Sequence, residues 1–276
     1  MKMIKGSRLY LVFVLLAGMA CVSHLKDAKT SYAQGQRLAR NYQTQASQSL
    51  FQKAREEALR EVQGKPSSQA YMVKGLAELE LEMWREAEES FLEAFHLGFE
   101  KGEEWAHHLA LFGLASSLEE SGLKDSSLQV YNYLLERSRI PAITLLAAQK
   151  YTESELKAAL EEEEREKAKT LNSLLKMAQR LTEKDMSCGY YSYLQSQIYG
   201  HQVQYRLSFE KAVMARELGL PSEALSRDND NQIVFCYRGL KQALAPGDWE
   251  EFLSIYREWM RRWNWTDPEI PSWKKR

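Results

Sequence analysis

The stretch from Tyr71 to Phe99, YMVKGLAELELEMWREAEESFLEAFHLGF, determines the fold expected of this chain. It predicts two helices joined by a short turn, with Gly75 in the first helix and Trp84 at the turn. The second helix carries small and large residues in alternation: Ala87, Phe91 and Ala94. Such a helix pair cannot bury its apolar face alone, so it predicts neighbouring pairs that stack on it.

The same alternation recurs at a spacing of 40 residues, from Phe51 to Phe91 to Tyr131. The flanking positions repeat as well: Ser47 and Ala54 flank Phe51, and Ser127 and Leu134 flank Tyr131, with the larger Leu134 in place of an alanine. Gly75 aligns in the same way with Gly35 and Ala115. Three segments with one pattern indicate an array of stacked helix pairs.

At these residues the chain resembles the tetratricopeptide repeat (TPR) family, whose motif has a small residue in the first helix and an Ala, Phe, Ala series in the second. The resemblance covers residues 31–135 well and 186–263 weakly. It implies an all-α fold, a right-handed superhelical solenoid of about five TPR-like helix pairs. It also implies a scaffold that binds other proteins.

Composition agrees with an all-helical chain, because glycine (14) and proline (6) are sparse among 276 residues and helix-forming residues dominate. Lysine and arginine (37) nearly balance aspartate and glutamate (38). No global positive field therefore points to nucleic acid, and we expect no nucleic-acid partner.

Residues 1–20 have the layout of a signal peptide: a basic start, an apolar core and small residues before Cys21. The position of Cys21 resembles the bacterial lipoprotein signal, which implies lipidation of this cysteine. Gly18 stands where that signal usually has Leu. Val22, rather than Asp, implies export to the outer membrane. The alternatives are a secreted protein or one anchored by an uncleaved N-terminal segment.

The pattern divides the rest of the chain into five parts. They are a polar tether (21–30), TPR-like repeats (31–140), irregular helices (141–185), degenerate repeats (186–264) and a tryptophan-containing tail (265–276). Within the irregular part we expect a short helix over 142–150 and a long charged helix over 153–181. A linker rich in Asp and Asn is expected at 226–231.

No sequence motif predicts catalysis, a cofactor or a metal site: the chain lacks GxSxG, HExxH, a phosphate loop and paired CxxC. Adjacent His107 and His108 point about 100° apart on a helix, so they cannot chelate one ion from one face. The acidic run at 161–164 is interpreted as a solvated face. Cys188 and Cys236 are either a disulfide or two buried thiols.

Two groups of aromatic and amide residues are candidate partner-binding sites. Tyr190, Tyr191, Tyr193 and Gln197 fall on the first helix of the fourth pair, where they would suit an extended peptide; the alternative is that the tyrosines are core. Trp265 and Trp273 lie in a proline-containing tail. They either pack against the fold, lie in the groove as a self-ligand, or contact a partner or membrane surface.

These features predict a non-enzymatic binding or assembly scaffold of the bacterial cell envelope. It would be held at the membrane by its N-terminal lipid, face the periplasm and bind other envelope proteins or peptides. The assignment to the envelope rests on fold-level analogy. The alternatives are an accessory TPR lipoprotein of a periplasmic solute transporter and a cell-wall enzyme with a catalytic Glu.

Overall fold

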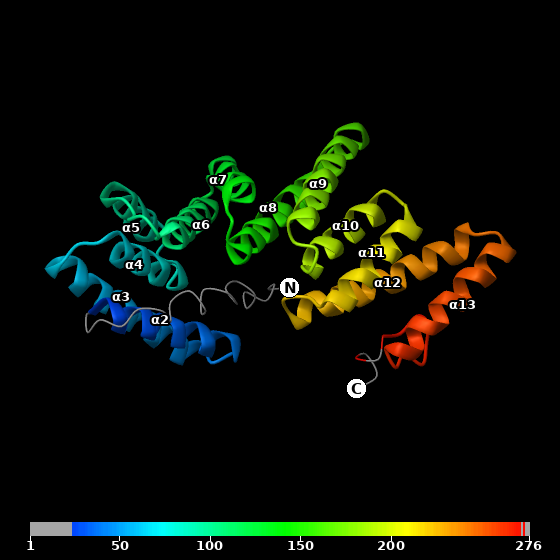
Figure 1. The fold of residues 1–276 in the computed structure, drawn as a ribbon, viewed down its shortest axis with the longest axis horizontal. Coiled ribbons are helices and arrows are strands. Elements are labelled where there is room, and N and C mark those ends of the chain that lie inside the picture. The colour runs from blue at the N-terminus through cyan, green and yellow to red at the C-terminus, as the bar shows by residue number, and fades with distance from the viewer. Residues whose placement is uncertain (1–23, 272, 274–276) are drawn as a thin grey trace. The chain divides into compact units, whose positions relative to one another are not determined.

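The computed structural model describes residues 24–271 and 273, which form twelve α-helices and one isolated antiparallel bridge (Figure 1). Residues 1–20 and Cys21, which carry the predicted signal and lipidation site, lie outside the described residues. The chain divides after Glu153 into two compact units, called here unit 1 and unit 2. Among the described helices, none is long and apolar enough to cross a membrane.

Unit 1 contains three helix pairs and most of a seventh helix (Figure 1). The pairs are α2 (His24–Arg40) with α3 (Thr44–Gly64), α4 (Ser68–Glu80) with α5 (Trp84–Leu97), and α6 (Glu104–Glu120) with α7 (Lys124–Arg137). Helix α8 (Pro141–Glu161) follows and crosses the division between the units. The three pairs predicted from the 40-residue repeat are confirmed.

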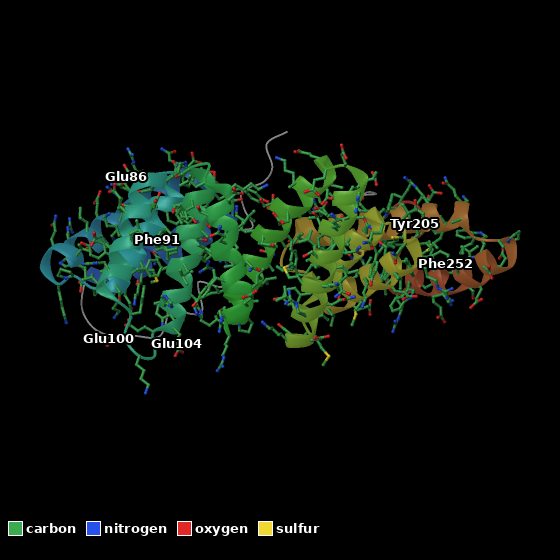
Figure 2. All side chains as sticks on the ribbon, turned by 90° about the horizontal axis from the view of Figure 1, so that it is seen from above. Glu86, Phe91, Glu100, Glu104, Tyr205 and Phe252 are labelled. Atoms are coloured by element: carbon green, nitrogen blue, oxygen red, sulfur yellow. The ribbon has the colours of Figure 1, made fainter. Side chains whose placement is uncertain are left out.

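The repeated small and large residues form the core of unit 1. All nine positions of the three sets are at most 3% exposed: Ser47, Phe51, Ala54, Ala87, Phe91, Ala94, Ser127, Tyr131 and Leu134. The predicted glycines are needed for this packing, because a Cβ on Gly35 would lie 2.7 Å from the Phe51 ring. Phe91, labelled in Figure 2, packs against both Gly75 and Gly113, so its ring joins its own helix pair to the next one.

A buried carboxylate ties the first two pairs together. Glu78 is fully buried, and its oxygens contact Arg55 Nε at 3.1 Å, Lys74 Nζ at 2.9 Å and Ser90 Oγ at 2.6 Å. These partners come from α3, α4 and α5. A buried charge is tolerated only when it is paired and hydrogen-bonded, so this network requires all of its members.

Replacing Lys74 with Met is expected to lower the free energy of unfolding by about 2 kcal/mol, because Glu78 stays buried with one cation fewer. Urea unfolding followed by circular dichroism measures the change. Lys101→Met, at an exposed position, is the control and should be nearly neutral. Equal stability of the two variants would contradict a structural role for the network.

The predicted tether is wrong over residues 24–30, because α2 begins at His24 rather than at Ser31. Contacts with α3 hold this first part of the helix. His24 Nδ1 lies 2.8 Å from Glu57 Oε2, and the Leu25 backbone N–H donates to Glu61 Oε2 at 3.2 Å. Tertiary contacts of this kind extend a helix beyond its apolar periodicity.

The long helix predicted over 153–181 is also wrong. The chain instead forms α8 up to Glu161 and α9 (Glu164–Lys184), with Glu163 in an extended conformation between them. The break separates the consecutive glutamates and places Glu164 and Glu166 in the first turn of α9. Carboxylates in the first turn are favoured by the helix dipole. In a continuous helix, glutamates three or four residues apart would lie side by side and repel one another.

Unit 2 contains α9 and two further pairs. The pairs are α10 (Gly189–His201) with α11 (Tyr205–Leu218), and α12 (Glu223–Ala243) with α13 (Pro246–Arg262). The linker predicted at 226–231 is wrong, because these residues lie within α12. Two of their polar side chains bond to α11: the amide of buried Asn229 donates to the Ala212 carbonyl at 2.8 Å, and Asp230 pairs with Arg216.

Candidate functional site

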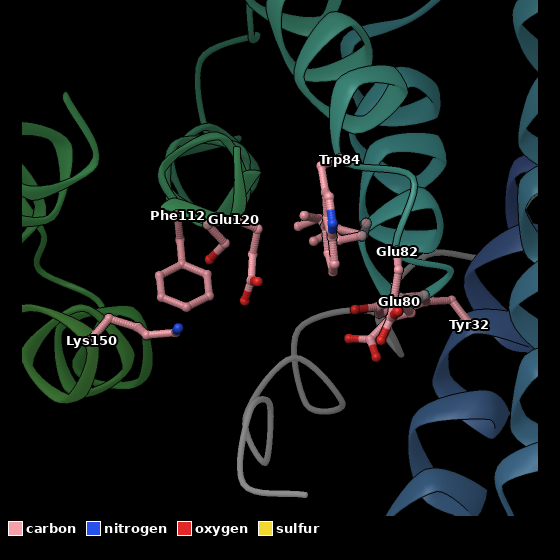
Figure 3. A pocket seen from close by; sticks show the side chains of 10 residues that line it. Tyr32, Glu80, Glu82, Trp84, Phe112, Glu120 and Lys150 are labelled. Atoms are coloured by element: carbon pink, nitrogen blue, oxygen red, sulfur yellow. The ribbon is translucent and has the colours of Figure 1, made fainter. Parts of the chain in front are cut away.

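A cleft in unit 1 is lined mainly by the first helices of successive pairs (Figure 3). It encloses about 80 Å³ of space that water-sized groups can enter, within an open region of about 650 Å³ that includes solvent. We call it the unit 1 cleft; its lining residues are Tyr32, Leu76, Leu79, Glu80, Glu82, Trp84, Phe112, Ser116, Glu120 and Lys150. The 40-residue repeat continues into it, since Leu76 aligns with Ser116 and Glu80 with Glu120. One cleft therefore presents equivalent positions of consecutive repeats.

The floor and the rim of the cleft differ in character. Tyr32, Leu76 and Phe112 are at most 4% exposed and form a closed aromatic and aliphatic floor. Trp84, Glu80 and Glu120 are half-buried, and Glu82 is exposed. In Figure 3, Glu80 and Glu82 lie on one side of the cleft, while Glu120 and Lys150 lie on the other. The rim thus combines a tryptophan with glutamates, whereas the floor is apolar.

Hydrogen bonds from the core hold both sides of the cleft. On one side Gln36 Nε2 donates to Glu80 Oε1 at 2.7 Å and to Tyr32 Oη at 3.1 Å. On the other side Tyr131 of the repeat pattern donates to Glu119 Oε2 at 3.2 Å, and Lys150 Nζ lies 2.7 Å from the same oxygen. The residues that define the fold therefore also position the rim.

Tyr32 lies beside Glu80 at the floor of the cleft. Burial raises the pKa of Tyr32 well above its usual value, and the charge of Glu80 raises it further, while Arg40 acts in the opposite direction. Among residues 24–271 and 273, three glutamates and Lys150 line the cleft, and Lys150 pairs with Glu119. Tyr32 is fully buried and its hydroxyl accepts a hydrogen bond from Gln36, so the raised pKa keeps it neutral as a part of the core.

The tyrosines predicted to contact a partner are buried or half-buried within unit 2. Tyr190 and Tyr191 are 6% and 2% exposed, so the alternative that they are core is the correct one. Tyr193 is half-buried, and burial, followed by the charge of Asp228, raises its pKa. Gln197 donates to Gln232 of α12 at 3.3 Å. Gln197 thus contacts α12, and partner binding through Tyr193 and Gln197 stays a prediction.

The C-terminal tail packs against unit 2. Trp265 is 4% exposed within a core of residues from α11, α12 and α13. Trp273 Nε1 donates to Asp230 Oδ2 at 3.1 Å, and Tyr256 Oη donates to the Pro268 carbonyl at 2.7 Å. Arg216 stacks over the rings of Trp263 and Trp265 at 4.8 and 5.2 Å. The packing alternative therefore accounts for both predicted tail residues.

Cys188 and Cys236 are both free thiols, so the disulfide alternative is wrong. Cys236 is fully buried in the core of unit 2, where it donates to Ser208 Oγ at 3.0 Å. Burial raises the pKa of Cys236 to about 11 and also raises that of half-buried Cys188.

In a Cys21→Ser background, an aromatic disulfide reagent at pH 8 is expected to modify Cys188 well before Cys236, since the thiolate is the reactive form. Because the pKa of Cys236 is higher in the folded state than in the unfolded one, its neutral thiol favours folding below about pH 8.5, and this contribution is lost as pH rises toward 11. Equal labelling rates in the native protein would contradict the burial of Cys236.

The histidine pair lies in an aromatic setting. His107 packs against Phe95 and Phe99 with ring centroids 5.6 and 5.4 Å apart, and burial lowers its pKa. Glu103 accepts a hydrogen bond from Gln69. Within residues 24–271 and 273, no group of three or more His, Cys, Asp or Glu side chains is arranged to hold a metal ion.

Sequence analysis did not single out the rim of the unit 1 cleft, although it contained a signal. Leu76, Glu80 and Trp84 lie four residues apart within the segment that determines the fold. The alignment that revealed the core also pairs Leu76 with Ser116 and Glu80 with Glu120. What the sequence lacked was the position of α8, which brings Lys150 to the cleft.

Comparison with known proteins gives limited information. No protein-family model matches the chain, and no curated protein matches it. Among solved structures, the crystal structure of YrrB, described as a TPR protein with an unusual peptide-binding site, is similar over 74% of this chain and 92% of that one. The sequence identity is 18% and the TM-score 0.40, so we draw no functional conclusion from it.

Proposed function

We propose that the protein is a non-enzymatic scaffold that holds an extended segment of another protein in the unit 1 cleft. The observation that carries the proposal is the lining of this cleft. Equivalent residues of consecutive repeats, Leu76 with Ser116 and Glu80 with Glu120, line one open cleft beside Trp84. A row of repeated positions suits a chain that runs across several helices, and a half-buried tryptophan is a common anchor for such contacts.

A selection from a library of short random peptides tests this proposal. Peptides that bind the full chain are measured again with Trp84→Ala and with Trp105→Ala. Trp105 is the matched control, because it is also half-buried near the start of a helix but does not line the cleft. We expect Trp84→Ala to weaken binding about tenfold or more, the usual loss at an aromatic anchor, with little effect of Trp105→Ala. Failure to select any peptide, or equal effects of the two variants, would overturn the proposal.

We further propose that the scaffold works in the cell envelope, where lipid on Cys21 would anchor it to the outer membrane. The support is the order of a basic start, an apolar core and small residues before Cys21. Labelling bacteria with a clickable fatty acid tests this. Label on the wild-type chain that is lost in Cys21→Ser is the expected result. No label on either protein would contradict lipidation and would leave a secreted protein or one with an uncleaved anchor.

A further inference from the structure

A second pocket of unit 1 lies at the other end of α5 and α6 from the unit 1 cleft. The cleft is lined by the first residue of α5 and the last residue of α6, whereas this pocket is lined by residues near the end of α5 and the start of α6. It encloses about 220 Å³ of space that water-sized groups can enter. We call it the loop pocket; its lining residues are Phe95, Gly98, Phe99, Glu100, Glu104 and His107.

Three aromatic rings form one wall of the loop pocket. Phe95, Phe99 and His107 are half-buried, and their ring centroids lie 5.4 to 5.8 Å apart in pairs. The Phe95 ring is inclined by 60° to Phe99 and by 83° to His107, so the rings face in different directions instead of stacking. Burial lowers the pKa of His107, which keeps its imidazole neutral near neutral pH. The wall is therefore aromatic and uncharged.

Hydrogen bonds within the chain hold the loop that joins α5 to α6. The Glu100 backbone N–H donates to Glu103 Oε2 at 3.0 Å, and the Glu103 backbone N–H donates to the Glu100 carbonyl at 3.0 Å. The Glu103 side chain also accepts a hydrogen bond from Gln69 of α4. A loop held in this way forms its pocket without a ligand, which lowers the ordering cost of binding.

Two exposed carboxylates line the loop pocket beside the rings. Within the described part of the chain, the carboxylates of Glu100 and Glu104 make no hydrogen bond or ion pair. Lys101 lies between them in sequence, but it is exposed and does not line the pocket. Among the described residues these carboxylates and His107 are not arranged to hold a metal ion. Their charge therefore complements an organic cation.

We propose that the loop pocket binds the methylated ammonium group of a small organic cation such as choline. Aromatic rings attract such a group, because its methyls make apolar contacts while it carries a full positive charge. A primary ammonium is more strongly hydrated and gains less from the rings. A phosphate on the same ligand would meet Glu100 and Glu104, which disfavours a phosphocholine headgroup. The site goes beyond the proposed function, since it shares no lining residue with the unit 1 cleft.

The test titrates the full chain with four small probes and follows the proton signals of each probe by NMR. Choline carries the proposed group. Its uncharged tert-butyl analogue keeps the shape without the charge, ethanolamine lacks the methyls, and phosphocholine adds an anion. We expect choline to bind about tenfold more tightly than the tert-butyl analogue and several-fold more tightly than ethanolamine. Phosphocholine should bind more weakly than choline.

Three variants assign the binding to the loop pocket. Phe99→Ala removes a ring from the connecting loop and is expected to weaken choline binding about tenfold. At low salt Glu100→Gln/Glu104→Gln should weaken it about threefold, since exposed charges contribute modestly. Glu86→Gln/Glu89→Gln, at exposed positions of α5, loses the same charge and should have no effect. Figure 2 shows Glu86 at the opposite edge of unit 1 from Glu100 and Glu104. Circular dichroism checks that each variant is folded.

Five results would overturn the inference. Absence of choline binding refutes the site itself. A tert-butyl analogue that binds as tightly as choline would make the pocket a purely apolar one, and ethanolamine that does so would refute the need for methyl groups. Phosphocholine that binds more tightly would contradict the role given to the two carboxylates. Equal effects of the two charge variants would show that only net charge matters. Peptide binding in the unit 1 cleft is measured separately, so none of these results bears on the proposed function.

Discussion

Phe91→Ala is expected to lower the free energy of unfolding of unit 1 by about 3–5 kcal/mol, the range for removing a fully buried phenylalanine. The ring is 0% exposed and packs against glycines of two helix pairs, Gly75 and Gly113. Glycine has no side chain that can move into the space left behind, so the cavity stays open. Urea unfolding of the full chain, followed by circular dichroism, measures the loss.

A double-mutant cycle with Gly113→Ala serves as the control. A Cβ on Gly113 would overlap the Phe91 ring, so we expect Gly113→Ala alone to cost about 1–3 kcal/mol. In the Phe91→Ala background the overlap is gone, and the higher helix propensity of alanine should make the same substitution neutral or stabilising. An equal cost of Gly113→Ala in both backgrounds would contradict the packing described for this ring.

Trp265→Ala is expected to destabilise unit 2 by a similar amount, about 3–5 kcal/mol. The indole is 4% exposed and is covered by Trp263, with ring centroids 5.2 Å apart, and by the guanidinium of Arg216. Its loss removes the main apolar contact by which the tail joins the core of α11, α12 and α13. Thermal unfolding monitored by circular dichroism at constant protein concentration reports the effect.

Trp265→Phe is the informative control for this position. Within the described residues the Trp265 indole N–H is buried without a hydrogen-bond partner. Phenylalanine keeps an aromatic ring in the core and removes that unsatisfied donor, so the two effects oppose each other. We expect the Phe variant to lie within about 1.5 kcal/mol of wild type. A loss as large as that of the Ala variant would show that ring packing is not what stabilises the tail.

The fold of unit 1 followed from the sequence because its core repeats. Phe51, Phe91 and Tyr131 occupy equivalent buried positions, and the small residues beside them admit the close contacts. Unit 2 was harder because its polar residues are buried. Asn229 and Asp230 resemble a linker in sequence, but they are internal residues of a helix whose partners come from α11 and the tail. Local propensity cannot anticipate partners that are distant in sequence.

The candidate site shows the same limit. The aromatic cluster at Tyr190 and Tyr191 suggested a binding surface, yet these rings are core of unit 2. Composition alone does not distinguish a buried tyrosine from an exposed one, because tyrosine suits both settings. The unit 1 cleft depends on which face of α4 and α6 remains open, and this is settled only once α8 is in place. The 40-residue alignment that revealed the core also pairs Glu80 with Glu120, but the pattern alone does not show that these positions line a cleft.

The central claim, that an extended segment of a partner protein lies in the unit 1 cleft, is tested most directly by photo-crosslinking. A selected peptide carries a benzophenone near its centre, and mass spectrometry identifies where it attaches to the full chain. The account predicts attachment within residues 76–84 and 112–120, which line the cleft. This attachment should be lost in Trp84→Ala, which removes a lining residue of the cleft, and kept in Trp105→Ala. Attachment in unit 2, or spread along the chain and unchanged in Trp84→Ala, would contradict it.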